Sequence, residues 1–364
     1  MENDIHGAAS EAPAGSTPRI KTEHFEFTGT GGEYFRIWIV NLLLSIITLG
    51  IYSAWAKVRR LRYFYGSTQL AGSSFEYHGD PINILKGRLI AFALLLPYSF
   101  ASQISPLLGV VFALLFLIAL PFIVVRSRRF QTRMSSWRNI RFNFVGRYGS
   151  AAWIYIGMAF LIPLTLGLII PYIMFARQRF LLGEAKMGAT PVQFNATPGR
   201  YYLTYLFAGL VLVGTFIVAG IVIAGVFGGG ISDVFSAKSE MRDNAGAGIL
   251  VGCIVVGGYL MAIAIVQAGL TNAAYGELGI GLHEVNCDVS PFQLAGIYFT
   301  NTLFMVLTVG LYTPWATIRL ARYHLECMRV DVAGDLNQFA QEQLEKTSAT
   351  GEEIGDLFDM DFGL

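Results

Sequence analysis

Asparagine, threonine, tryptophan and arginine recur at intervals of seven residues in two distant parts of the chain. The members of the two sets are Asn41, Thr48, Trp55, Arg62, Asn301, Thr308, Trp315 and Arg322. Because seven residues are about two helical turns, each set shares one face if its helix is continuous. Such a polar seam could bind a solute inside a membrane, or it could join helices.

A third copy of the pattern lies between these two. A shift of 117 residues from the first copy gives Thr165 and Arg179, with Met158 in place of Asn and Tyr172 in place of Trp. A shift of 260 residues gives the last copy without gaps. So many matches at fixed offsets indicate internal duplication. The candidate site is therefore the whole seam: Asn41, Thr48, Trp55, Arg62, Thr165, Arg179, Asn301, Thr308, Trp315 and Arg322.

Two interpretations of the seam stay open. Many transporters place their sites at repeat interfaces, which favours a permeation path or a binding cleft. Polar contacts between membrane helices are common, which favours packing, with Trp at headgroup depth and Arg just beyond it. Packing is the favoured interpretation.

Catalytic chemistry has no recognisable motif here. The chain contains no phosphate-binding loop, no dinucleotide fingerprint after a strand, no zinc-protease motif and no nucleophile elbow. The cysteines at 253, 287 and 327 and the five histidines do not cluster, so we predict no metal, no cofactor and no catalytic residue. The net charge of +1 argues against nucleic acid as a partner.

Composition places the chain in a membrane. Of its 364 residues, 54% are hydrophobic and only 14% are charged, about half the usual charged share of a soluble domain. Seven apolar stretches approach the roughly 20 residues that cross a bilayer. They span residues 35–56, 88–104, 105–125, 151–175, 202–228, 246–270 and 295–316.

The basic residues set the expected topology and create a conflict. Loops 126–150 and 177–200 are both basic, although they flank the same stretch, 151–175. Positive charge favours the cytoplasmic side, so a single crossing would violate the rule for one loop. The alternative is that stretches 35–56, 151–175 and 295–316 enter and return, each breaking at its Thr-x-Gly step. The bent alternative is favoured.

Short strands are predicted between the apolar stretches. Residues 25–29, 75–79 and 142–146 share the pattern aromatic-x-aromatic-x-Gly, and residues 192–194 and 283–285 are weaker versions. Alternating aromatics ended by glycine are typical of strands followed by turns. Pairing of 25–29 with 75–79 would bring both ends of the first stretch to one side. The predicted fold is thus an all-α polytopic membrane protein with internal repeats and short cytoplasmic β-hairpins.

The expected organisation follows from these elements. We predict a disordered tail over residues 1–22, repeat unit 1 over 23–125, repeat unit 2 over 126–270 and a partial repeat unit 3 over 271–330. Residues 331–364 form an acidic tail, expected on the cytoplasmic side, with a helix over 336–344. This tail could dock on the basic loops of the same chain or on a protein partner.

The motifs together resemble a known family. Thr48 to Tyr52 with Trp55, the same pattern from Thr308 to Tyr323, and the tail from Gly351 to Asp359 resemble the YjgN-like bacterial inner-membrane proteins, a group defined as a domain of unknown function. The resemblance spans nearly the whole chain and implies a multi-pass protein of the bacterial inner membrane. It implies no reaction, substrate or cofactor.

Two functions follow as expectations. The first is transport or permeation of a small or lipid-like solute at the repeat interface. The alternative is a non-catalytic scaffold or lipid-interaction protein that uses its basic loops and its acidic tail, with membrane lipids, anionic ones among them, as partners of the loops.

Overall fold

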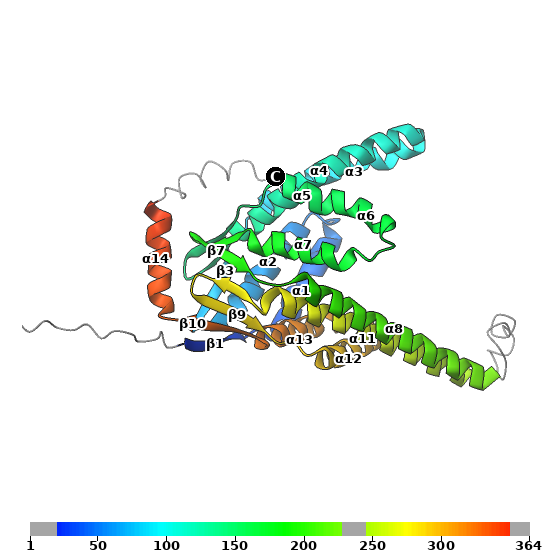
Figure 1. The fold of residues 1–364 in the computed structure, drawn as a ribbon. Coiled ribbons are helices and arrows are strands. Elements are labelled where there is room, and N and C mark those ends of the chain that lie inside the picture. The colour runs from blue at the N-terminus through cyan, green and yellow to red at the C-terminus, as the bar shows by residue number, and fades with distance from the viewer. Residues whose placement is uncertain (1–19, 228–244, 350–364) are drawn as a thin grey trace, which may run out of the picture.

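The computed structural model describes residues 20–227 and 245–349. Ten short strands in this part of the chain form one closed antiparallel barrel (Figure 1). Their bounds are β1 Ile20–Phe27, β2 Thr68–Leu70, β3 Ser73–Tyr77, β4 Ser135–Trp137, β5 Ile140–Phe144, β6 Ala185–Met187, β7 Thr190–Phe194, β8 Leu278–Ile280, β9 His283–Cys287 and β10 Met328–Ala333.

The barrel closes between the first and the last strand. Strands β2 to β10 are neighbours in chain order, and β1 lies between β2 and β10. Its beginning pairs with β10, Ile20 opposite Ala333, and its end pairs with β2, Phe25 opposite Leu70. Residues 20–22 are therefore strand, so the predicted disordered tail is wrong at its boundary. Residues 1–19 lie outside the described chain.

The prediction of an all-α protein is wrong, because the strands build a full barrel. Five strands are at the predicted aromatic segments: β1, β3, β5, β7 and β9. The other five strands were missed: β2, β4, β6 and β8 are three residues long and too short to show a period of two, and β10 has six residues but lacks the aromatic motif. Strand β2 also separates β1 from β3, so 25–29 and 75–79 do not pair directly and are joined through β2.

Helices leave one end of the barrel in pairs (Figure 1). Within the described residues their bounds are α1 Gly31–Ile47, α2 Ser53–Ser67, α3 Pro81–Ile104, α4 Pro106–Arg133, α5 Tyr148–Ala152, the π-helical η1 Trp153–Gly157, α6 Met158–Leu164, α7 Ile170–Gly183, α8 Pro198–Phe227, α11 Ala245–Tyr275, α12 Pro291–Leu307 and α13 Thr313–Glu326. Each pair packs against the next, and α13 packs against α1, so the pairs form a closed ring.

Four helices are long and apolar enough to cross a membrane. They are Pro81–Ala101, Pro106–Arg133, Pro198–Gly225 and Gly248–Tyr275. They correspond to the predicted stretches 88–104, 105–125, 202–228 and 246–270. Basic residues are sparse at residues 232–244, between the last two stretches, which predicts a turn on the outer side. This segment lies outside the described chain.

The other three apolar stretches break and return. At each Thr-x-Gly step the residue after Thr and the glycine have positive φ: Leu49 (50°) and Gly50 (91°), with the same geometry at 166–167 and 309–310. Glycine adopts this left-handed conformation without the steric cost of a Cβ. Both ends of α1/α2 therefore lie at the barrel, as the bent alternative requires. The tip residues Leu49, Leu166 and Val309 are 94%, 92% and 93% exposed, as apolar residues surrounded by lipid would be.

Apolar side chains fill the barrel. Inward-facing residues of the strands form one cluster: Phe25, Leu70, Phe75, Trp137, Ile140, Phe142, Met187, Val192, Phe194, Leu278, Ile280, Val285, Met328, Val330 and Val332. Phe75 lies against the rings of Phe25, Trp137 and Phe142, with centroids 6.2–6.5 Å apart. The barrel is thus a packed core, as expected when strands close a narrow cylinder.

The last described helix, α14 Leu336–Ala349, covers the end of the barrel opposite the helical ring (Figure 1). Its Leu336, Phe339 and Ala340 join the barrel cluster. The predicted helix over 336–344 is therefore confirmed. In the described residues the acidic tail docks on its own chain; residues 350–364 lie outside the described chain.

Candidate functional site

The aromatic-x-aromatic-x-Gly motif connects each strand to the helices above it. The second aromatic ring of each copy lies against the glycine two residues later. A Cβ at Gly29, Gly79 or Gly146 would lie 2.8, 2.5 or 2.4 Å from that ring, closer than any real contact. The motif requires glycine because the backbone passes directly under the ring.

Two seam arginines hold these glycines from the neighbouring helical pair. The Arg62 Nη2 atom donates to the carbonyl of Gly79 at 3.4 Å, and Arg322 Nη2 donates to the carbonyl of Gly29 at 2.9 Å. Arg179 of the middle copy makes no hydrogen bond or ion pair with any described residue. Two of the three arginines therefore join one helical pair to the next.

The seam tryptophans and threonines have local partners. Trp55 stacks on Tyr52 and Trp315 stacks on Tyr312, with ring centroids 6.2 and 6.1 Å apart. Trp315 also covers Gly31, at the start of α1 in the adjacent pair.

Each seam threonine hydrogen-bonds its own helix at the break. The hydroxyls of Thr48, Thr165 and Thr308 donate to the carbonyl four residues earlier at 2.7, 2.8 and 2.6 Å. The hydroxyls of Thr48 and Thr308 also accept from the backbone N–H of Tyr52 and Tyr312. These contacts stabilise the helix break. Each threonine hydroxyl bonds its own helical pair, so the three threonines do not form a common binding site.

The seam asparagines are buried between helices. Asn41 is 8% exposed and Asn301 is 4% exposed. The Asn301 Nδ2 atom donates to the carbonyl of Ala316 at 3.4 Å, which joins α12 to α13. The Oδ1 atoms of both asparagines are buried without a hydrogen-bond partner in the described chain.

Cations without carboxylate partners lie on four of the five helical pairs of the described chain. We name this set the cation belt: Lys57, Arg59, Arg60, Arg62, Arg88, Arg128, Arg129, Arg177, Arg179, Arg319 and Arg322. Every ion pair between described residues involves other cations. Two belt arginines lie over tyrosine rings instead, Arg129 over Tyr148 at 6.0 Å and Arg177 over Tyr155 at 4.9 Å.

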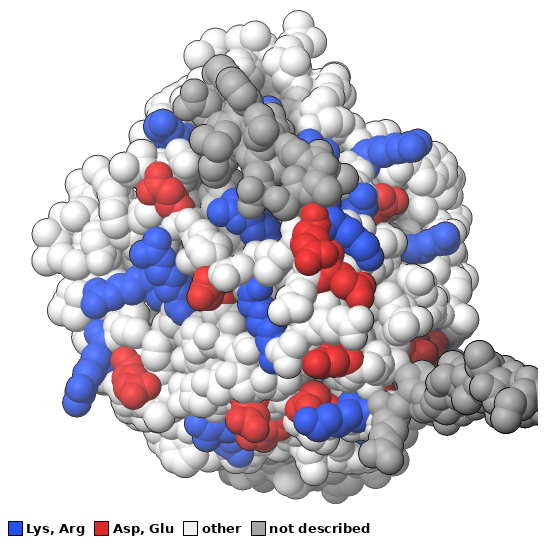
Figure 2. Space-filling model, turned by 90° about the vertical axis from the view of Figure 1, so that its left-hand side faces the viewer, with Lys and Arg blue, Asp and Glu red and all other residues white. Residues whose placement is uncertain are grey.

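The covered end of the barrel has a different charge pattern. Figure 2 shows lysines and arginines interspersed with acids over this end. A surface with both signs of charge is typical of contact with water, whereas the helical ring exposes large apolar residues. The belt therefore lies between a water-facing and a lipid-facing part of the molecule.

Helix α14 is held at the barrel by polar as well as apolar contacts. Gln343 is 1% exposed, and its Oε1 atom accepts from the backbone N–H of Ala189 at 3.1 Å. The ring of Phe339 meets His283 edge to face at 4.9 Å. His283 is 5% exposed, both of its ring nitrogens lack a hydrogen-bond partner among the described residues, and its burial lowers its pKa.

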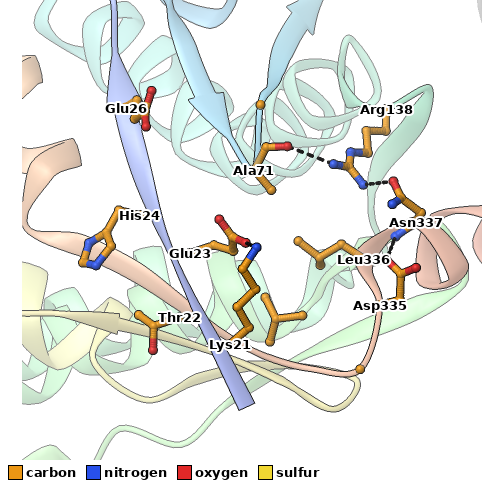
Figure 3. A pocket seen from close by; sticks show the side chains of 13 residues that line it. Lys21, Thr22, Glu23, His24, Glu26, Ala71, Arg138, Asp335, Leu336 and Asn337 are labelled. Atoms are coloured by element: carbon orange, nitrogen blue, oxygen red, sulfur yellow. Dashed lines mark hydrogen bonds and ion pairs between the residues drawn. The ribbon is translucent and has the colours of Figure 1, made fainter. Parts of the chain in front are cut away.

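A pocket of about 440 Å³ lies beside the beginning of α14 (Figure 3). Arg138 closes one side, donating to the carbonyl of Ala71 at 3.0 Å and to Asn337 Oδ1 at 2.7 Å. Lys21 pairs with Glu23 at 2.5 Å within the same wall. The pocket thus has both cations and carboxylates in its lining, with one ion pair among them.

The described residues offer little for covalent or metal chemistry. In residues 20–227 and 245–349 no three His, Cys, Asp or Glu side chains gather as metal ligands would. Burial raises the pKa of Cys287 to about 12, with a smaller contribution from Cys327. That thiol stays protonated at neutral pH and is a poor nucleophile.

The seam residues thus act within and between adjacent helical pairs, and their contacts do not gather all ten around one ligand. Sequence reasoning identified the basic loops but missed which cations lie close together, because Lys57, Arg60 and Arg88 come from two helices. The described part of the molecule is a membrane protein by its four long apolar helices.

Comparison with known proteins also indicates a membrane protein. The chain is 34% identical over 152 residues to proteins named inner membrane protein YjgN from Escherichia coli O157:H7 and from Escherichia coli strain K12. The Salmonella typhimurium protein of that name is 32% identical over 145 residues. The matches cover 40–41% of this chain and 37% of each relative's length. No solved structure matches.

The family model of bacterial proteins of unknown function, DUF898, matches residues 22–357, nearly the entire chain. The chain therefore belongs to the DUF898 family of membrane proteins of unknown function.

Proposed function

We propose that this protein is a non-catalytic inner-membrane protein that holds anionic phospholipids through its cation belt. The observation that carries the proposal is a set of cations on membrane helices without a carboxylate partner in the described chain. An uncompensated charge at the edge of hydrocarbon is costly. Phosphate groups of lipids are the anions available at that depth, and each nearby Lys or Arg contributes about 1 kcal/mol to binding an anionic surface.

The belt also gives the proposed orientation. Basic residues near the ends of membrane helices favour the cytoplasmic side. The belt lies at the barrel end of the helical ring, so the barrel and α14 would lie in the cytoplasm. The acids Glu342 and Glu345 on the exposed face of α14 would then be available to a cytoplasmic protein partner.

The lipids that purify with the protein test the proposal. The full chain is extracted in a mild detergent, and the ratio of phosphatidylglycerol to phosphatidylethanolamine that it retains is compared with that of the source membrane. We expect enrichment of phosphatidylglycerol. A retained ratio equal to that of the membrane would contradict the proposal.

Transport of a small or lipid-like solute is the second candidate. It is favoured by the buried, unpartnered Oδ1 atoms of Asn41 and Asn301, because an amide oxygen can accept a hydrogen bond from a passing solute. The apolar filling of the barrel argues against a water-filled path along its axis. A solute would have to cross beside the helices rather than through the strands.

Flux through reconstituted vesicles tests this candidate. The double variant Asn41→Leu/Asn301→Leu removes both amide oxygens, and Gln293→Leu, at an exposed position of α12, is the control. If the asparagines serve a solute, flux is lost in the double variant and kept in the control. Equal flux in all three proteins would assign the asparagines to packing alone.

A further inference from the structure

Three cations meet between α2 and α3. On α2, Ser53, Lys57 and Arg60 are spaced by four and three residues and therefore share one helix face. From α3, the Arg88 Nη1 atom donates to the Ser53 hydroxyl. The charges of Arg88 and Arg60 both act on Lys57, so the three cations lie close together.

This cluster has no internal counter-charge. None of Lys57, Arg60 and Arg88 forms an ion pair with a carboxylate of the described residues. Burial lowers the pKa of Lys57, and the positive charges of Arg88 and Arg60 lower it further. Like charges brought together at a partly buried position are unfavourable unless an anion joins them.

The position of the cluster along the helices identifies the anion. Arg88 is followed directly by exposed apolar residues of α3, including Leu89 and Phe92. On α2, Ser53 follows the exposed apolar tip of the broken helix around Leu49. The cluster therefore lies where a membrane-embedded surface begins, which is the depth of lipid phosphates.

We infer that Ser53, Lys57, Arg60 and Arg88 form a binding site for the phosphate of an anionic phospholipid. The guanidinium of Arg88 and the ammonium of Lys57 donate charge-assisted hydrogen bonds to the phosphate oxygens. Arg60 contributes its positive charge, and the acyl chains lie against the apolar surface of α3. The inference rests on the proposed lipid-binding function and assigns it to one site.

Titration of single lipids tests the site. The full chain in detergent is titrated with phosphatidylglycerol or with phosphatidylcholine of the same chain length, and bound lipid is counted by native mass spectrometry. The variant Lys57→Gln/Arg88→Gln is compared with Arg36→Gln/Lys86→Gln. The second variant removes two exposed charges from α1 and α3 that belong neither to the cluster nor to the cation belt. A further variant, Arg88→Lys, keeps the charge.

We expect the Lys57→Gln/Arg88→Gln variant to bind phosphatidylglycerol about 25-fold more weakly, at about fivefold for each cation. The matched control should bind as the wild type does, and Arg88→Lys should keep most of the affinity. Melting temperatures of all variants in lipid-free detergent show whether each is folded.

The outcomes separate the site from the wider function. If the wild type prefers phosphatidylglycerol but both double variants bind it equally, this site is wrong while the proposed function stands. If the wild type has no preference between the two lipids, both are wrong. Inorganic phosphate is a third ligand in the titration, and cluster-dependent binding of phosphate without a preference for phosphatidylglycerol would replace the lipid with free phosphate.

Discussion

The Nη2 atom of Arg322 donates to the carbonyl oxygen of Gly29 at 2.9 Å, across 293 positions of the sequence. This bond joins the last helical pair to the turn before the first one. Arg62 makes the same contact with Gly79, between the first pair and the second. Two residues that recur in the sequence thus connect neighbouring units of a ring.

Removing the Arg322 guanidinium should loosen the closure of the ring. We expect Arg322→Gln to cost about 1 kcal/mol, because a charge-assisted bond is lost but the exposed side chain is partly screened by solvent. Thermal unfolding in detergent measures the loss. Arg329→Gln, an exposed arginine of β10 without such a bond, is the control, and an equal effect of both changes would contradict the role given to Arg322.

A methyl group at Gly146 should be poorly tolerated. The added Cβ would lie 2.4 Å from the ring of Phe144, which is 1% exposed and cannot move aside. We expect Gly146→Ala to cost about 1–3 kcal/mol, the range for overpacking. Gly66→Ala, on a helix with open space around the added Cβ, should be neutral or stabilising. The melting temperatures of the two variants test this prediction. It fails if Gly146→Ala melts no lower than Gly66→Ala.

The contact of Gln343 with the barrel should hold α14 in place. Gln343→Leu leaves the partly buried N–H of Ala189 without this acceptor, which costs about 1 kcal/mol. Hydrogen exchange of the turn between β6 and β7 should become faster. Exchange as slow as in the wild type would show that α14 docks without this bond. Glu345→Leu, on the exposed face of the same helix, is the control.

Docking of α14 should weaken in acid through His283. Burial lowers the pKa of His283 in the folded state below its ordinary value of 6.5. Above that value the imidazole is neutral in both the folded and the unfolded state, so it does not change the stability. As the pH falls below about 6.5, the undocked or unfolded state binds the proton more readily, so stability is lost.

Hydrogen exchange of α14 between pH 8 and pH 5.5 measures this dependence. Exchange rates corrected for intrinsic chemistry should rise toward acid in the wild type. In His283→Phe, which keeps an aromatic ring beside Phe339, the rise should be smaller. An equal rise in both proteins would assign the acid sensitivity to other groups.

Local chemistry in the sequence determined several elements of this protein. Apolar length indicated seven membrane stretches, and four of them are the long helices, because a helix of that length has few other environments than lipid. The Thr-x-Gly steps indicated the breaks, since Gly50 supplies the left-handed backbone there. Paired aromatics ended by glycine indicated three of the ten strands, with Gly29, Gly79 and Gly146 lying under the second ring, and weaker versions of the pattern indicated two more. The helix at Leu336 was also visible from its own residues.

Only the tertiary structure decided how these elements join. The pairing of Ile20 with Ala333 closes the barrel between the two ends of the chain, and no local pattern carries information over that separation. Strands of three residues become strands only because neighbours on both sides supply their hydrogen bonds. The meeting of Lys57 with Arg88 likewise depends on how α2 packs against α3. Long-range packing brings such charges together, and their spacing in the sequence does not predict it.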